Sequence, residues 1–176
     1  MAATSISGTV RVVIDLVEIN VDGSGDPITK FHRDDTTIQL GMGTGDYQVD
    51  RIWSDANKSI SGATTLDMAG SSNLPDAAGA SQTFAEVGLL YVRNLSGTSG
   101  QKISIGNGGA NSVNGGPAFL PDDTSVINVP EGGILLLVCP KDANQIAITA
   151  GTADILGLDV SGGTQSAKMI IAGHSV

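Results

Sequence analysis

The sequence predicts an all-β protein, specifically an antiparallel two-sheet sandwich of the jelly-roll type with about 8–10 strands. Short segments rich in Val and Ile recur along the chain at intervals of roughly ten residues, the spacing typical of sandwiches and barrels. Gly, Pro, Asp or Asn bounds each of these segments. No capped amphipathic pattern long enough for an α-helix occurs in the sequence.

The chain has 176 residues, enough for one ordinary domain and too few for two, so we expect a single domain over residues 1–176. A charged fraction of 15% with 40% hydrophobic residues excludes the class of disordered proteins. The net charge of −9 argues against nucleic acid as a partner, because phosphate binding depends on Lys and Arg. The start lacks the features of a secretory signal and no stretch is apolar over ~18 residues, so we expect no membrane partner.

Residues 1–42 are predicted to form a hairpin of two long strands. Residues 5–21 carry β-branched side chains at both alternating positions, a pattern that favours a strand covered on both faces. Turn formers fill residues 22–27, and a second strand-like pattern covers residues 28–40. The Gly-rich residues 41–45 mark the border with the main sandwich, residues 43–176. About forty residues cannot fold alone, so we expect the hairpin to belong to the sandwich, or to act as a docking arm if it extends past it.

The main sandwich is predicted from a series of shorter segments. Residues 69–80 are expected to form a surface connection with room for one helical turn. Residues 106–116, with five Gly and three Asn, are expected to form a loop that is mobile or is ordered by a partner. The expected strands cover residues 47–54, 59–68, 84–94, 101–105, 125–129, 134–138, 145–149, 154–158 and 167–172.

The sequence offers little for catalysis. A Ser or Cys nucleophile needs a general base, usually His, and the chain has only His32 and His174. His174 lies near the end of the sequence and His32 in a charged segment expected to be a turn, so both are predicted to be surface histidines. Cys139 follows an apolar run and is predicted to be buried and inert. We therefore expect no catalytic residues and no enzyme activity.

One segment has the outline of a metal site. Asp22, Ser24 and Asp26 alternate as in a calcium loop, but Arg33 stands where the closing Glu would be and the flanking segments are strands. A turn is the preferred interpretation, and a metal held by these three residues stays an open alternative.

The sequence contains two pairs of adjacent acidic residues, at positions 34–35 and 122–123. On a strand the side chains of neighbouring residues point to opposite faces, so neither pair is ready for acid–base chemistry. The Gly-rich residues 106–116 lack a phosphate-binding pattern. We therefore expect no cofactor and no metal.

Seven short stretches of the sequence, taken together, carry a resemblance to a known group of proteins. They are residues 43–55 (GTGDYQVDRIWSD), 66–70 (LDMAG), 83–87 (TFAEV), 92–94 (VRN), 129–133 (VPEGG), 149–154 (TAGTAD) and 170–173 (IIAG). Together they resemble a group of small β-sandwich, jelly-roll virion proteins of tailed bacteriophages, including capsid decoration proteins. The likeness runs from about residue 43 to residue 173, and the first 40 residues contribute no phrase to it.

The resemblance implies a non-enzymatic structural protein of the virion that decorates or cements the capsid surface. It also implies partners among the virion proteins, above all the major capsid protein, and assembly in the host cytoplasm. A homo-oligomer is expected, with a trimer as first choice because capsids offer sites of local threefold symmetry. The alternative is a receptor- or glycan-binding module of a head or tail fibre. The scarcity of aromatic residues, with one Trp, two Tyr and three Phe, disfavours that alternative.

Overall fold

The computed structural model describes residues 5–21, 27–70, 74–75, 79–113, 120, 122, 124–141 and 145–175. Within them the fold is all-β, as predicted, and the helical content is one short 3-10 turn, η1 (Gly109–Asn111). The strands are β1 (Gly8–Val21), β2 (Pro27–Met42), β3 (Gln48–Val49), β4 (Arg51–Ser61), β5 (Thr64–Asp67), β6 (Glu86–Asn94), β7 (Lys102–Gly106), β8 (Val126–Pro130), β9 (Ile134–Val138), β10 (Ile146–Ala147), β11 (Ile155–Val160) and β12 (Thr164–His174).

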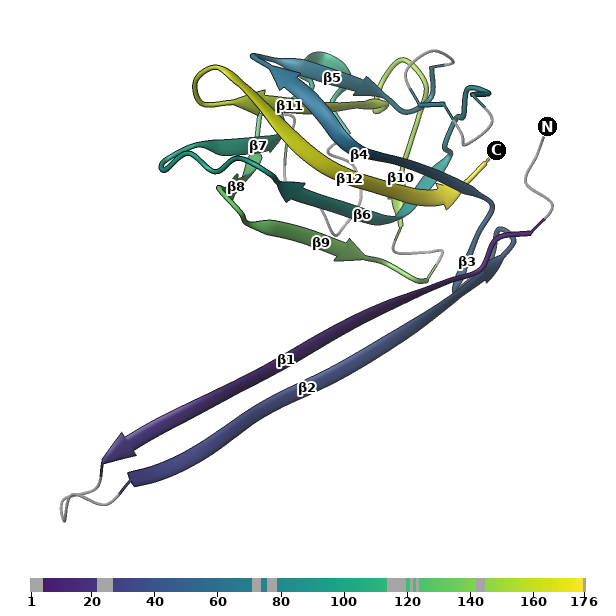
Figure 1. The fold of residues 1–176 in the computed structure, drawn as a ribbon. Helices are drawn as coiled ribbons and strands as arrows, with labels where there is room; N and C mark the ends of the chain where they lie inside the picture. Colours follow the sequence, from purple (N-terminus) through teal and green to yellow (C-terminus); the bar gives the residue numbers. More distant parts are fainter. Residues whose placement is uncertain are drawn as a thin grey trace.

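Strands β4 to β12 form a two-sheet body with nested pairing (Figure 1). Strand β4 pairs with β12, β5 with β11, β6 with β9 and β7 with β8, all antiparallel. Further pairing of β12 with β6 and of β11 with β7 joins these pairs into sheets ordered β9-β6-β12-β4 and β5-β11-β7-β8, with β10 beside β6. A long hairpin rolled up in this way is a jelly roll, so the predicted sandwich is confirmed.

The core lies between the two sheets and explains the strand pattern of the sequence. In β12 buried and more exposed positions alternate from Gln165 to Met169, because successive side chains point to opposite faces. Each fully buried Leu, Ile or Phe side chain contributes about 1.5–3 kcal/mol to stability. The largest fully buried side chains belong to Phe84, Ile60, Leu66, Met68, Leu74, Leu90, Ile103, Ile105, Leu156, Leu158, Met169 and Ile171.

Strands β1 and β2 form a long hairpin, called here the arm, that projects from one end of the body (Figure 1). The two strands pair at fourteen positions, from Gly8 opposite Leu40 to Val21 opposite Pro27. Its base joins the body through β3, which pairs in parallel with the end of β2. The predicted hairpin is therefore present. The expectation that it is covered on both faces as part of the sandwich is wrong, because the body of the same chain reaches only the base of the arm.

Two connections differ from what the sequence predicted. In residues 106–113 the chain forms η1 and then buries Ser112 and Val113, so the end of the described part of the Gly-rich segment is packed against the body. Hydrogen bonds from Val113 N to Ile155 O (2.8 Å) and from Asp154 N to Asn111 O (3.1 Å) fix it to the start of β11. In the connection at 69–80, Leu74 is fully buried and no helical turn occurs among the described residues.

Candidate functional site: an apolar arm and the groove at its base

His174 is a buried structural residue and not the surface histidine that the sequence suggested. It lies in β12 with 3% of its surface exposed. Its Nε2 is 2.8 Å from the carbonyl oxygen of Gln48, and its Nδ1 is 3.3 Å from a carboxylate oxygen of Glu86. Both ring nitrogens therefore face acceptors, and this fixes β3 against the sheet. The prediction failed because His174 ends β12, a strand that pairs with β4 on one side and with β6 on the other.

His32 lies in β2 and not in a turn, so the turn expected there is corrected to a strand. Its side chain is outside the described residues. Asp22, Ser24 and Asp26 also fall outside the described residues, so a metal held by these three residues stays an open alternative. Within the part of the chain that the structure describes, no cluster of three or more His, Cys, Asp or Glu side chains is arranged to hold a metal ion.

The neighbouring acids Asp34 and Asp35 lie within β2 rather than in a turn, and they have separate partners. Asp35 accepts hydrogen bonds from Nε and Nη2 of Arg11 at 2.9 and 2.7 Å, and this pairing lowers the pKa of Asp35. Asp34 is contacted by the Thr36 hydroxyl at 3.3 Å. The two acids thus form no dyad, in agreement with the strand geometry used to predict this.

Asp122 organises a turn before β8. Its Oδ1 accepts hydrogen bonds from the backbone N–H and the hydroxyl of both Thr124 and Ser125, at 2.7 to 3.0 Å. These bonds favour the charged carboxylate and lower the pKa of Asp122. Asp123, the second acid of this pair, lies outside the described residues.

Cys139 is buried, as predicted, with 8% of its surface exposed. It directly follows β9, and its backbone N–H donates to the carbonyl of Gly88 at 2.7 Å. Burial raises the pKa of the Cys139 thiol, which keeps it in the less reactive protonated form.

The arm has two different faces, because alternate residues of each strand point to opposite sides. The inner face is turned toward the body at its base. It is apolar along β1, with Val10, Val12, Ile14 and Leu16, and mixed along β2, with Asp34 and Thr36 beside Ile38 and Leu40. The outer face mixes apolar and charged side chains: Thr9, Arg11, Val13, Asp15 and Val17 of β1, with Phe31, Arg33 and Asp35 of β2. Two ion pairs cross the outer face, Arg11 with Asp35 and Arg33 with Asp15, each at 2.7 Å.

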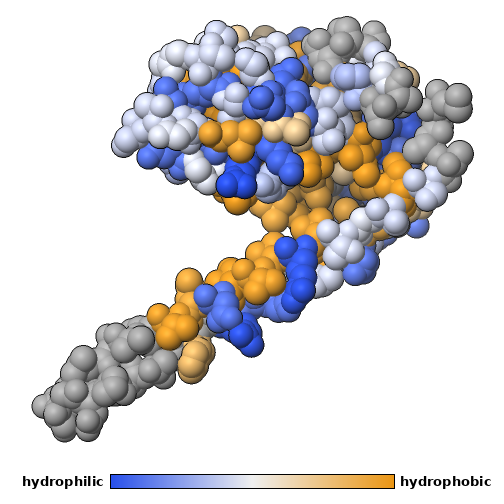
Figure 2. Space-filling model, viewed as in Figure 1, coloured by the Kyte–Doolittle hydropathy of each residue, from blue (hydrophilic) through white to orange (hydrophobic). Residues whose placement is uncertain are grey.

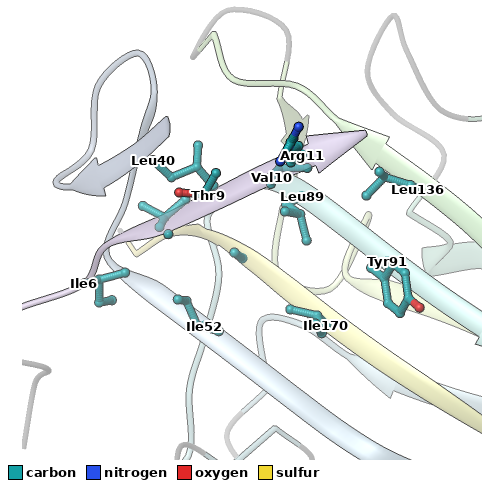
Figure 3. A pocket seen from close by; sticks show the side chains of 13 residues that line it. Ile6, Thr9, Val10, Arg11, Leu40, Ile52, Leu89, Tyr91, Leu136 and Ile170 are labelled. Carbon is teal, nitrogen blue, oxygen red and sulfur yellow. The ribbon is translucent and has the colours of Figure 1, made fainter. Parts of the chain in front are cut away.

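A groove of about 350 Å³ lies between the base of the arm and the body (Figure 3). Most of its lining is apolar, and Thr9, Arg11 and Tyr91 bring the polar groups. Figure 2 shows the same hollow, with apolar side chains on both the arm and the body around it. The body contributes Ile52, Leu89, Tyr91, Leu136, Ile170 and Ala172 from the outer surface of the sheet β9-β6-β12-β4, and β3 contributes Val49.

Beyond this groove the arm presents large apolar side chains to solvent. Leu16 is 61% exposed, Phe31 is 71% exposed, and Val13 and Val17 are each 53% exposed. A two-stranded hairpin is at best marginally stable in water, and an uncovered apolar strand edge invites pairing with another chain. Exposed apolar side chains and an unpaired strand edge are the features through which proteins bind other chains by apolar burial and by strand addition.

Sequence and structure searches add no relative to this description: no family model, no curated protein and no solved structure matches the chain. Among the described residues no helix is long and apolar enough to cross a membrane.

Proposed function

We propose that this chain is a non-enzymatic structural protein of a tailed-bacteriophage virion that decorates or cements the capsid surface. The jelly-roll body is the displayed part and the arm is the element that engages neighbouring virion proteins, the major capsid protein first among them. The phrases between residues 43 and 173 that resemble such virion proteins support this proposal.

The exposed apolar arm is the observation that carries the proposal. Leu16, Val17 and Phe31 are not among the residues that line the groove, and each is more than half exposed. Burying one such side chain is worth about 1.5–3 kcal/mol, so covering several of them provides a substantial share of a specific binding energy. An assembly protein needs a surface of this kind, because its neighbours in the particle supply the missing cover.

The alternative, a receptor- or glycan-binding module, needs exposed aromatic side chains gathered in a loop cluster. Trp53 and Phe84 are buried in the core. Of the described aromatic residues, Tyr47 and Phe31 are exposed, and they lie at the base of the arm and on the arm itself. This distribution favours a protein-binding arm over a glycan platform.

Particle binding tests the proposal. Purified chain is mixed with tailed-phage particles that encode it and have been stripped of it, and the pelleted fraction is measured. Wild-type chain should pellet with the particles, and immunogold labelling should decorate their heads. The Leu16→Asp variant should lose binding, because a carboxylate replaces an apolar contact on the arm. The matched control Leu95→Asp changes a body residue that is 40% exposed and should bind normally.

Absence of the chain from purified particles would refute the proposal. Attachment of the chain to host cells, with no attachment to stripped heads, would support the receptor-binding alternative in its place.

A further inference from the structure

We propose that β1 pairs antiparallel with β1 of a second copy of this chain, about a twofold axis at Val13. The two arms then form one four-stranded sheet in the order β2-β1-β1-β2. This inference names a partner for the arm and so rests on the arm being an assembly element, as the proposed function requires. It is tested with purified chain alone, separately from particle binding.

The free edge of β1 is the first observation. Within the described residues β1 pairs with β2 and with no other strand, while β2 also pairs with β3 at Gly41 and Met42. One edge of a fourteen-residue strand is therefore without a strand partner, and its first residues, 8–11, line the groove beside the body. Its sequence, GTVRVVIDLVEINV, contains no Pro and no Lys, two residues that commonly block edge pairing.

The charges of β1 select the register. With the twofold axis at Val13, Arg11 lies opposite Asp15 of the second copy, and Asp15 lies opposite its Arg11. Valine, isoleucine and leucine then face one another elsewhere: Val12 opposite Ile14, and Val10 opposite Leu16. Opposite charges and apolar pairs directly across a sheet are both stabilising.

Other registers of the β1–β1 pair place like charges, or a charged and an uncharged residue, opposite one another. An axis at Arg11 sets two guanidinium groups against each other, and an axis at Asp15 does the same with two carboxylates. An axis at Val12 or at Ile14 leaves both charged residues opposite uncharged ones. A register shifted by a single residue moves the apolar inner face of one arm to the outer face of the other.

The ion pairs between β1 and β2 within each arm continue the alternation of charges across the proposed four-stranded sheet. Asp15 is bonded to Arg33 of β2, and Arg11 is bonded to Asp35 of β2. In the paired arms the outer face therefore carries alternating charges, from Arg33 and Asp15 of one copy to Arg11 and Asp35 of the other. A guanidinium has five N–H donors and its bonds to Asp35 use two, so Arg11 keeps donors for a second carboxylate.

Mixing two charge variants tests the register. Arg11→Asp alone should face Asp15 of its copy, and Asp15→Arg alone should face Arg11, so each variant should dimerise about tenfold or more weakly than wild type. In an equimolar mixture both cross-strand pairs are again complementary, and sedimentation should show a 1:1 heterodimer. The mixture also controls for damage within each arm, because that damage is the same with and without the second variant.

Cysteine cross-linking locates the axis. Val13 and Val17 lie on the same strand and face and are equally exposed, at 53%. Paired strands place Val13 directly opposite its own copy, about 4.5–5.5 Å apart at Cα, which is within disulfide range. The Val13→Cys variant should therefore oxidise to a covalent dimer. Val17→Cys should not, because residue 17 lies opposite Thr9 and roughly 25 Å from its own copy at the spacing of a strand.

A wild-type chain that stays monomeric at tens of micromolar overturns the pairing, as does a trimer that is insensitive to the charge variants. Cross-linking through Val17→Cys with none through Val13→Cys overturns the register. A chain that dimerises through β1 yet never binds particles supports the pairing and refutes the proposed function. A chain that binds particles as a monomer does the reverse.

Discussion

Removing the side chain of Val113 measures how firmly the Gly-rich segment is held in the fold. Val113 is 1% exposed and packs in the main core. Val113→Ala deletes two buried methyl groups, a transfer loss of about 1.6 kcal/mol at ~0.8 kcal/mol each. The space left behind adds a cavity cost, so the free energy of unfolding should fall by roughly 2–3 kcal/mol. For a chain of this size the melting temperature should drop by roughly 4–12 °C.

Urea unfolding followed by tryptophan fluorescence provides the assay, because Trp53 lies in the same core cluster as Val113. Val126→Ala is the matched control, since Val126 is 41% exposed and the same deletion there should cost less than about 0.5 kcal/mol. Both variants are compared at one protein concentration, because association also stabilises a chain. Equal, small effects of the two substitutions would refute the conclusion that residues 106–113 are part of the packed core.

Three further predictions concern single sites in the body. Gly157→Ala should destabilise the fold by about 3 kcal/mol or more, because a Cβ there would overlap the carbonyl oxygen of Gly106, whereas Gly97→Ala has open space and should be nearly neutral; thermal unfolding of both variants measures this. Cys139 in native protein should react with a thiol reagent about 100-fold more slowly than in urea, and comparable rates would contradict its burial. The pKa of Asp122 is lowered, so its charge stabilises the fold above the ordinary carboxyl pKa, and this contribution is lost as pH falls. The difference in unfolding free energy between wild type and Asp122→Asn should therefore shrink from about pH 6 to about pH 2. A difference that stays constant over this pH range would contradict the prediction.

Most strands of the body were predictable because their cause is local, although residues 51–61, expected as parts of two separate strands, form the single strand β4. Alternation of apolar and polar residues, with turn formers between the segments, predicted a strand at residues 84–94 and another at 134–138. The structure has β6 at Glu86–Asn94 and β9 at Ile134–Val138. Both strands carry β-branched or large apolar residues that fit a pleated, half-buried surface.

Residues that depend on long-range pairing were harder to place. Val113 sits in a Gly-rich stretch whose composition indicates a loop, and it is buried because the start of β11 happens to lie beside it. His174 is near the end of the sequence, yet β4 and β6 enclose its strand on both sides. No local pattern encodes these neighbours, since they come from segments far away in the chain.

The arm shows a different limit of sequence reasoning. Apolar residues at both parities of residues 5–21 correctly indicated a strand. The pattern does not say whether the cover comes from the same chain or from another one. In the structure the body covers Val10 and Leu40 at the base, while Leu16 and Phe31 are exposed. The candidate interaction surface is thus the place where the expectation of intramolecular cover was wrong.

The central position of β12 also governs how the body can fold. Strand β12 lies between β4 and β6, so the sheet stays split into two pieces with open edges until residues 164–174 are in place. Closing contacts between such distant segments is slow, because the loop entropy is lost before the native contacts form. Before β12 has been synthesised, the ribosome-bound chain therefore exposes the unpaired edges of β4 and β6. The yield of the protein in cells should depend on chaperones that shield these edges.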